Sequence, residues 1–129
     1  MIEKIGEFSK AIIETLNLEI PLGTAIYIGE SNRRHMKSSH PRDYEKYHNR
    51  LSKILLSPDY AGINQSDGSI EIIKIFSNYV KVAVRIANDG EYYARSIYEV
   101  GKSRIDNSLK SGQLKQIKEN SFLKTIDKA

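Results

Sequence analysis

All three histidines of the chain, His35, His40 and His48, fall in one short stretch, GESNRRHMKSSHPRDYEKYH. Residues 31–53 around them carry seven basic and two acidic side chains. Imidazole titrates near neutral pH, so histidines beside positive charge can transfer protons on an anionic substrate. The same residues could equally be ordinary side chains on a helix surface or at a helix cap. The stretch therefore indicates either a proton-transfer site or a solvated helix face.

A second group of polar side chains lies on two strand-like segments, YVKVAVRIA and EYYARSIYEV, joined by Asn-Asp-Gly. If Asp89-Gly90 is a two-residue turn, residue 85 faces 94, residue 83 faces 96 and residue 81 faces 98. One face of the hairpin then carries Lys81, Arg85, Ser96 and Tyr98. With a three-residue loop, Ser96 and Arg95 exchange faces. Either register predicts a polar sheet face with at least one arginine.

His40 directly precedes a proline, so the chain should bend there. If this bend lies beside the polar sheet face, the two together are suited to phosphodiester cleavage without metal. The reaction needs a base for the 2′-hydroxyl, an acid for the leaving 5′-oxygen and cations for the developing charge. His35 or His40 could transfer the protons, and Arg85 could hold the phosphate.

Other chemistries lack their usual residues. The chain has no cysteine, and His35 and His40 are not spaced as the i, i+4 pair of a helical zinc site. No DxD or ExK spacing, phosphate-binding loop or dinucleotide fingerprint occurs. We therefore expect neither a metal nor a cofactor.

The spacing of apolar residues and the positions of proline and glycine predict the helices and strands that must position these groups. Apolar spacing predicts a helix over residues 2–16, and TAIYIG predicts a strand. We expect Ser31 to cap a short helix, and Pro41 to begin another over 41–56 after a bend at His40. A strand meander and one short helix after Gly101 complete the pattern. The predicted fold class is α+β, with N-terminal helices packed on a twisted antiparallel sheet of about four strands.

Composition limits the class of protein. The 129 residues, 40% hydrophobic and 28% charged, suit one globular domain, and no apolar run is long enough to span a membrane. The N-terminus lacks the apolar run of a signal peptide, so we expect a cytoplasmic protein. Residues 101–129 form a second basic block, with seven basic and three acidic side chains. Two basic blocks favour a polyanionic partner, although solvated charged helices would give the same composition.

The order of several motifs resembles a known family. IYIGESNRRHMKSSHPRDYEKYHNRLSKIL, PDYAGIN, DGSIEIIKIF, VKVAVRI and YYARSIY follow one another within about residues 26–114. Their His-x4-His-Pro, Pro-Asp-Tyr-x-Gly and Arg-Ser elements resemble the phage-associated nuclease domains of the barnase, EndoU, colicin and RelE superfamily, particularly the third phage-associated group. The resemblance implies a barnase/RelE-like α+β domain that cleaves RNA without metal at its sheet face.

Carried onto this sequence, the resemblance implies two sets of site residues. The catalytic set is His35, His40, Arg85 and Ser96. The substrate-binding set is Arg33, Arg34, Lys37, Tyr44, Lys81 and Tyr98, of which either tyrosine could stack on a base. Because catalytic residues vary within that superfamily, these positions are expectations.

These observations give one hypothesis for the whole chain. Residues 1–25 are an N-terminal amphipathic helix and linker, 26–114 the nuclease-like domain and 115–129 a basic, frayed tail. The function is a metal-independent endoribonuclease of toxin or mobile-element effector type, acting on tRNA or mRNA, with a cognate antitoxin or immunity protein as a second partner. The alternative is a catalytically inactive nucleic-acid-binding or protein-interaction module on the same fold.

Overall fold

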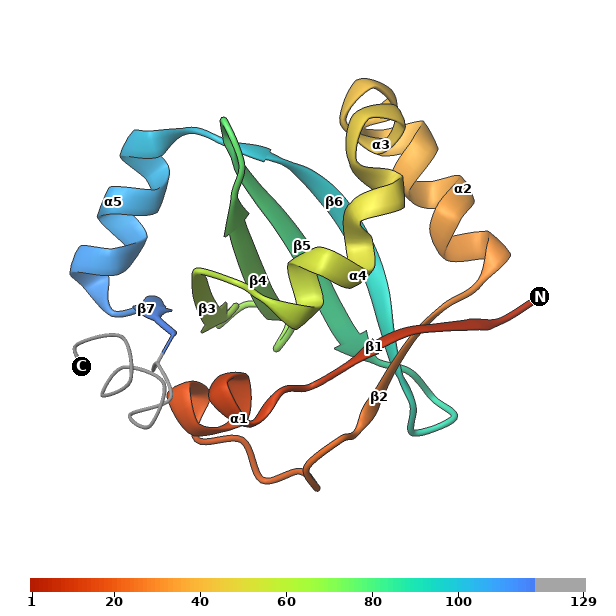
Figure 1. Cartoon of the computed structure of the whole chain (residues 1–129), viewed down its shortest axis with the longest axis horizontal. Helices are drawn as coiled ribbons and strands as arrows, with labels where there is room; N and C mark the ends of the chain where they lie inside the picture. The colour runs from red at the N-terminus through yellow and green to blue at the C-terminus, as the bar shows by residue number, and fades with distance from the viewer. Residues whose placement is uncertain (118–129) are drawn as a thin grey trace, which may run out of the picture.

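A mixed seven-stranded sheet forms the centre of the molecule (Figure 1). The computed structural model describes residues 1–117. Its strands are β1 (Glu3–Glu7), β2 (Ala25–Ile28), β3 (Tyr60–Ile63), β4 (Ile70–Ile75), β5 (Tyr79–Ile86), β6 (Tyr92–Val100) and β7 (Leu114–Gln116). Its helices are α1 (Lys10–Leu16), α2 (Glu30–Ser39), α3 (Pro41–Tyr47), the 3-10 turn η1 (His48–Arg50), α4 (Leu51–Leu56) and α5 (Lys102–Ser111). The strand order is β1-β2-β6-β5-β4-β3-β7, and β2 with β6 is the parallel pair.

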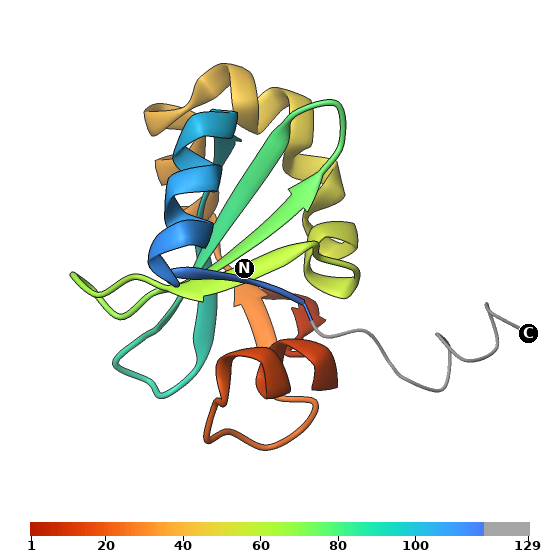
Figure 2. The ribbon, with the colours of Figure 1, turned by 90° about the vertical axis from the view of Figure 1, so that its left-hand side faces the viewer.

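The two faces of the sheet differ because side chains alternate along each strand. On β5, Val80, Val82 and Val84 are buried, and they pack with side chains of α2, α3 and α4 in the main core. Figure 2 shows α4 and α5 on opposite sides of the sheet. Under α5, Ile105 forms a smaller cluster with Ile73 and Leu114. The rest of this second face is polar and is left open between α5 and α2; we call it the open face.

The prediction of about four antiparallel strands behind N-terminal helices is wrong, although the class is α+β. Two of the additional strands, β1 and β7, are short edge strands. Their existence depends on pairing with β2 and β3, which lie well apart from them along the chain. Local pattern does not encode such pairing. The single helix after Gly101 is confirmed as α5.

The predicted helix over residues 2–16 is wrong in its first half. Residues 3–7 form β1 beside β2, and α1 begins only at Lys10, with the Ser9 hydroxyl accepting a hydrogen bond from the Ile12 N–H. Gly6 is unfavourable inside a helix, and in β1 its backbone lies against Leu55. Ile5 and Phe8 are both buried, but Ile5 lies in β1 and Phe8 in the link between β1 and α1, so no helix buries them.

The helical region after β2 also differs from the prediction in detail. Gly29, not Ser31, is the N-cap of α2, and its N–H donates to the Asn32 Oδ1 at 2.8 Å. The predicted bend at His40 is confirmed, since His40 ends α2 and precedes Pro41 at the start of α3. The expected continuous helix over 41–56 is divided by η1, and both parts bury apolar side chains, including Tyr47 and Leu51.

The β5–β6 hairpin combines features of both predicted registers. Its loop has three residues, 88–90, closed by a 2.8 Å hydrogen bond from the Ala87 N–H to the Glu91 carbonyl. Arg85 therefore pairs with Tyr93, so the two-residue turn is wrong. A β-bulge at Arg95 then restores the expected partners Ala83 with Ser96 and Lys81 with Tyr98.

A cluster around Glu99 fixes α3 on the sheet. The Glu99 Oε2 accepts hydrogen bonds from the Tyr47 hydroxyl at 2.6 Å, the Lys46 ammonium at 3.3 Å and the Asn78 amide at 3.3 Å. The Glu99 N–H donates to the Asp43 carboxylate at 3.1 Å. These contacts join α3 to β6 next to His40. They lower the pKa of the Glu99 carboxyl, with the Tyr47 hydrogen bond as the largest cause.

We predict that this cluster stabilises the fold above the ordinary pKa of a glutamate and loses its effect in acid. A carboxyl whose pKa is lower in the folded state contributes stability that disappears as pH falls through that pKa. The difference in free energy of unfolding between wild type and Glu99→Gln should therefore shrink from about pH 7 to about pH 3. Urea denaturation at both values measures it. A difference independent of pH would contradict the assignment.

We also predict that Gly62 is required for the β3–β7 edge. A Cβ at this position would lie 2.1 Å from the Gln113 carbonyl oxygen, so Gly62→Ala must displace β7. The expected loss in free energy of unfolding is about 1–3 kcal/mol, as for other overpacked sites. Gly101→Ala is the control, because a Cβ there would meet nothing within 4 Å and the φ of Gly101 is −67°. Equal effects of the two substitutions in chemical denaturation would refute the prediction.

Candidate functional site

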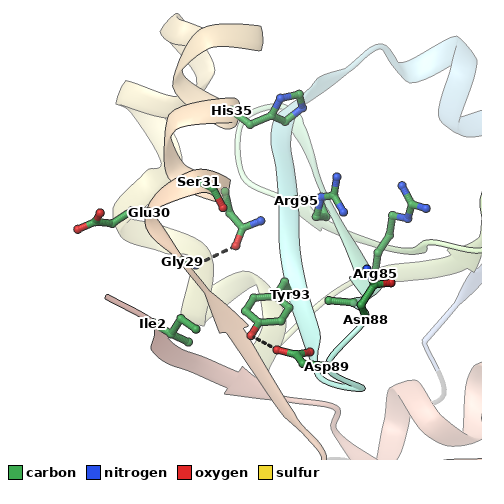
Figure 3. Close-up of a pocket in the computed structure, with 12 residues that line it drawn as sticks. Ile2, Gly29, Glu30, Ser31, His35, Arg85, Asn88, Asp89, Tyr93 and Arg95 are labelled. Carbon is green, nitrogen blue, oxygen red and sulfur yellow. Dashed lines mark hydrogen bonds between the residues drawn. The ribbon is translucent and has the colours of Figure 1, made fainter.

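A cavity of about 630 Å³ lies between α2 and the β5–β6 hairpin. Figure 3 shows labelled side chains of α2 and of the N-terminal Ile2 on one side of the cavity, and those of β5, β6 and their loop on the other. Two predicted catalytic residues, His35 and Arg85, line it. The remaining lining residues are Ile2, Gly29, Glu30, Ser31, Asn32, Ala87, Asn88, Asp89, Tyr93 and Arg95.

The positive charges of this cavity are not paired with acids. Within residues 1–117, neither Arg85, which is half-buried, nor Arg95, which is exposed, forms an ion pair with an acidic side chain. The two acids of the cavity are engaged elsewhere: Glu30 lies 3.5 Å from the N-terminal ammonium, and Asp89 accepts a hydrogen bond from Tyr93. The guanidinium groups are therefore available to an anion.

Asp67 interacts with Arg85 only through the longer-range attraction of their charges. Its Oδ1 accepts hydrogen bonds from the Ser69 N–H at 2.9 Å and the Ser69 hydroxyl at 2.7 Å. The backbone hydrogen bond from Ser69 is the largest cause of the lowered pKa of Asp67, and the charge of Arg85 is a smaller one. Asp67 thus adds to the local field without occupying the Arg85 guanidinium.

Tyr93 forms a fixed wall of the cavity. Its hydroxyl donates to the Asp89 Oδ2 at 2.7 Å, and its ring lies 6.0 Å from that of Tyr27 on β2. The Tyr93 hydrogen bond is the largest cause of the lowered pKa of Asp89, and the same bond raises the pKa of Tyr93. Tyr93 therefore stays a neutral phenol, held at its hydroxyl end.

His40 does not line this cavity. Its ring stacks on Tyr98 with the centroids 4.4 Å apart, beside a shallow hollow formed by residues 39–43. The Lys81 ammonium lies over the same Tyr98 ring, 5.1 Å from its centroid. Three predicted residues, His40, Lys81 and Tyr98, thus form a second cluster on the open face.

The positive charge of Lys81 is paired with an acidic side chain, in contrast to that of Arg85. Its ammonium lies 2.9 Å from the Glu71 Oε2, and the two side chains are only 16% and 6% exposed. Burial by itself would lower the pKa of Lys81, but hydrogen bonds to Tyr98 and Glu71 raise it above the ordinary value. The Gln113 amide donates to the other Glu71 oxygen at 3.2 Å. Such a pair, buried and satisfied, has less capacity to bind a phosphate than a free arginine.

The Lys81–Glu71 pair also lines a smaller cavity, of about 160 Å³, beneath α5. Arg104 and Ser108 of α5 contribute to it, together with Asn64 and Gln113. Ser96 lies on the sheet between the two cavities, opposite Ala83, and lines neither of them. The open face therefore has two small side chains, Ala83 and Ser96, between Arg85 and Lys81.

The basic residues of α2 lie away from the main cavity. Arg33 bonds to Glu3 at 2.6 Å, and a hydrogen bond to Tyr44 is the largest cause of its raised pKa. Arg34 and Lys37 are outside the cavity lining. Tyr44 stacks on His48 with the centroids 5.0 Å apart. Of the six predicted substrate-binding residues, none lines the main cavity.

Sequence reasoning did not assign Arg95, Tyr93 or Glu71 to the site. The unassigned arginine in YYARSIY was a signal, because a charged residue rarely enters a core without a partner. Glu71 likewise interrupts the apolar strand SIEIIKIF, and its partner Lys81 lies on the next strand. Tyr93 gave no such signal, since a tyrosine suits either face of a strand.

The arrangement provides a titratable imidazole and two cationic groups around one solvent-accessible cavity. Residues 1–117 contain no group of three or more His, Cys, Asp or Glu side chains placed to hold a metal ion. No helix in this part of the chain is long and apolar enough to cross a membrane. Proton transfer beside a bound anion is the chemistry that these side chains can perform.

Comparison with known proteins agrees with the family indicated by the motifs. No curated protein and no solved structure matches the chain. A family model described as phage-Barnase-EndoU-ColicinE5/D-RelE like nuclease3 matches residues 3–107. The matched segment begins in β1, includes the whole β5–β6 hairpin and ends in α5, so it contains every lining residue of the main cavity except Ile2. The chain therefore belongs to this family of phage-associated nuclease-like domains.

Proposed function

We propose that the protein is a metal-independent endoribonuclease whose active site is the cavity between α2 and the β5–β6 hairpin. The observation that carries the proposal is that His35 and Arg85, from distant parts of the sequence, line one cavity together. The family supports a nuclease-type function. RNA as substrate follows from the residues, because an imidazole and a guanidinium can cleave a chain that carries its own 2′-hydroxyl nucleophile.

In the proposed reaction, the 2′-oxygen attacks the adjacent phosphorus and the bond to the 5′-oxygen breaks. One group removes the 2′-hydroxyl proton and another supplies a proton to the leaving 5′-oxygen, which gives a 2′,3′-cyclic phosphate and a free 5′-hydroxyl. His35 transfers one of these protons, while Arg85 stabilises the phosphorane charge. Ser96, opposite Ala83 on the open face, and His40, stacked on Tyr98, remain the further catalytic candidates, and His40 would supply the second proton transfer.

The proposed ribonuclease would harm the cell that produces it unless an inhibitor were present. A nuclease that cleaves tRNA or mRNA in the cytoplasm would act as a toxin or mobile-element effector, and its producer would need an antitoxin or immunity protein. The open face is the surface that such an inhibitor would have to cover.

A non-catalytic nucleic-acid-binding module is the second candidate. The observation that favours it is the separation of the two histidines: His35 lines the cavity, whereas His40 is stacked on Tyr98 outside it. A single histidine beside two arginines could bind RNA without supplying both proton transfers.

We predict that the purified protein cleaves RNA in EDTA and that His35→Ala lowers the rate about a hundredfold to ten-thousandfold, the usual contribution of general acid–base catalysis. Mapping of the new ends should give 2′,3′-cyclic phosphates. His48→Ala is the matched control, because the His48 Nδ1 donates to the Tyr44 carbonyl at 2.9 Å and the residue lies outside the cavity lining. Strict dependence on magnesium, or wild-type rates in folded His35→Ala and His40→Ala proteins, would disprove the mechanism.

We further predict that RNA binding weakens with salt and that Arg85→Gln flattens this dependence. Each lost phosphate contact on a single strand should reduce the slope of log K against log salt by about 0.7. Arg34→Ala with Lys37→Ala should reduce it by about 1.4 if both contact flanking phosphates. The control is Lys10→Gln, on α1. An unchanged slope for Arg85→Gln would remove Arg85 from the phosphate site.

A further inference from the structure

The main cavity is larger than a phosphate requires, and its surface has a positively charged part and an apolar part. Its volume of about 630 Å³ lies within the range of small-molecule sites, about 300–1,000 Å³. Arginines line one part, while Tyr93 and Ile2 provide apolar surface in another. We propose that this cavity binds one unstacked nucleotide of single-stranded RNA, with its base on Tyr93 and its phosphate on Arg85 and Arg95. The inference rests on the proposed function and adds the determinants of substrate recognition.

Tyr93 has the properties of a stacking platform. Its hydroxyl is already hydrogen-bonded to Asp89 and its ring is supported by Tyr27, so its position is fixed before a ligand binds. Ile2, which is 60% exposed, lines the same cavity and offers a second apolar surface. A base that leaves the stack of a single strand gains contact with aromatic and aliphatic side chains of this kind.

The two arginines supply the phosphate side of the site. Arg85 pairs with Tyr93, and the alternation of side chains places Arg95, two residues further along β6, on the same face. Both guanidinium groups lack an ion-pair partner among residues 1–117, whereas Arg33 and Lys81 are paired with Glu3 and Glu71. The two free arginines are therefore the strongest phosphate-binding feature on this side of the molecule.

Asn88 lies at the loop that closes the cavity, and it is exposed. Within the described residues its side chain has no hydrogen-bond partner, so its amide can both donate to and accept from the edge of a base. Stacking on Tyr93 is tolerant of base type. Asn88 can therefore contribute to a preference among the four bases.

The test is equilibrium binding of the four nucleoside 3′-monophosphates and of inorganic phosphate, measured by calorimetry on the whole chain. We expect the nucleotides to bind more tightly than phosphate. Tyr93→Leu should weaken nucleotide binding about five- to a hundredfold, as for other stacked bases, and weaken phosphate binding much less, through the Asp89 carboxylate that it releases. Arg95→Gln should weaken both ligands, and Tyr93→Phe should keep most of the nucleotide affinity. Tyr79→Leu, outside the cavity, is the control for loss of a tyrosine.

A measurement on the wild-type protein tests the same contact even if the Tyr93→Leu variant does not fold. The base protons of a bound nucleotide should show nuclear Overhauser contacts to the Tyr93 ring. Extension to a trinucleotide with 2′-deoxyribose, which cannot be cleaved, should strengthen binding. Absence of the contacts, or equal affinity for phosphate and nucleotides, would each overturn the inference.

Binding and cleavage can fail separately. A chain that binds nucleotides through Tyr93 but cuts no RNA would refute the ribonuclease proposal and leave this inference standing. A chain that cuts RNA, but binds nucleotides equally well with Tyr93→Leu, would refute only the inference.

Discussion

The pairing of β5 with β6 fixes the position of most groups on the open face. Val80, Val82 and Val84 must face the main core, because their burial stabilises the sheet against α3 and α4. The alternation of side chains then places Lys81 and Arg85 on the other face. A register shift of one residue would expose the valines and bury the charges, so the apolar face determines where the polar chemistry can lie.

The helices add the remaining groups through their own core contacts. Met36 of α2 is fully buried, and α2 is held along the edge of β6 by that contact, with His35 on the adjacent, cavity-lining side. The cluster at Glu99 holds α3 to the C-terminal end of β6 and sets the bend at His40 next to Tyr98. His35, within α2, and His40, at the bend, therefore lie in different surroundings.

The open face has two parts that differ in whether their cations are paired with acids, and therefore in their capacity to bind an anion. Around Lys81, an acid, an amide and an aromatic ring satisfy the ammonium, which makes this part a rigid support. Around Arg85 and Arg95, the nearby acids are engaged by other groups, so the positive charge remains available. Because desolvating an already paired charge for a new ligand is costly, we place the proposed anion site at the free arginines and not at the lysine.

The sequence by itself determined the α+β class, the β4–β5–β6 meander, the bend at His40 and the family, because these depend on local alternation, turn residues and motif order. It also predicted His35 and Arg85 as site residues, and both line the main cavity. The tertiary structure decided the rest. Strands β1 and β7 exist through pairing between distant segments, and the β-bulge at Arg95 follows from a three-residue loop that must still bury Ile97. No local pattern distinguishes a paired Arg33 from a free Arg95, since the partner of each cation is chosen by the fold.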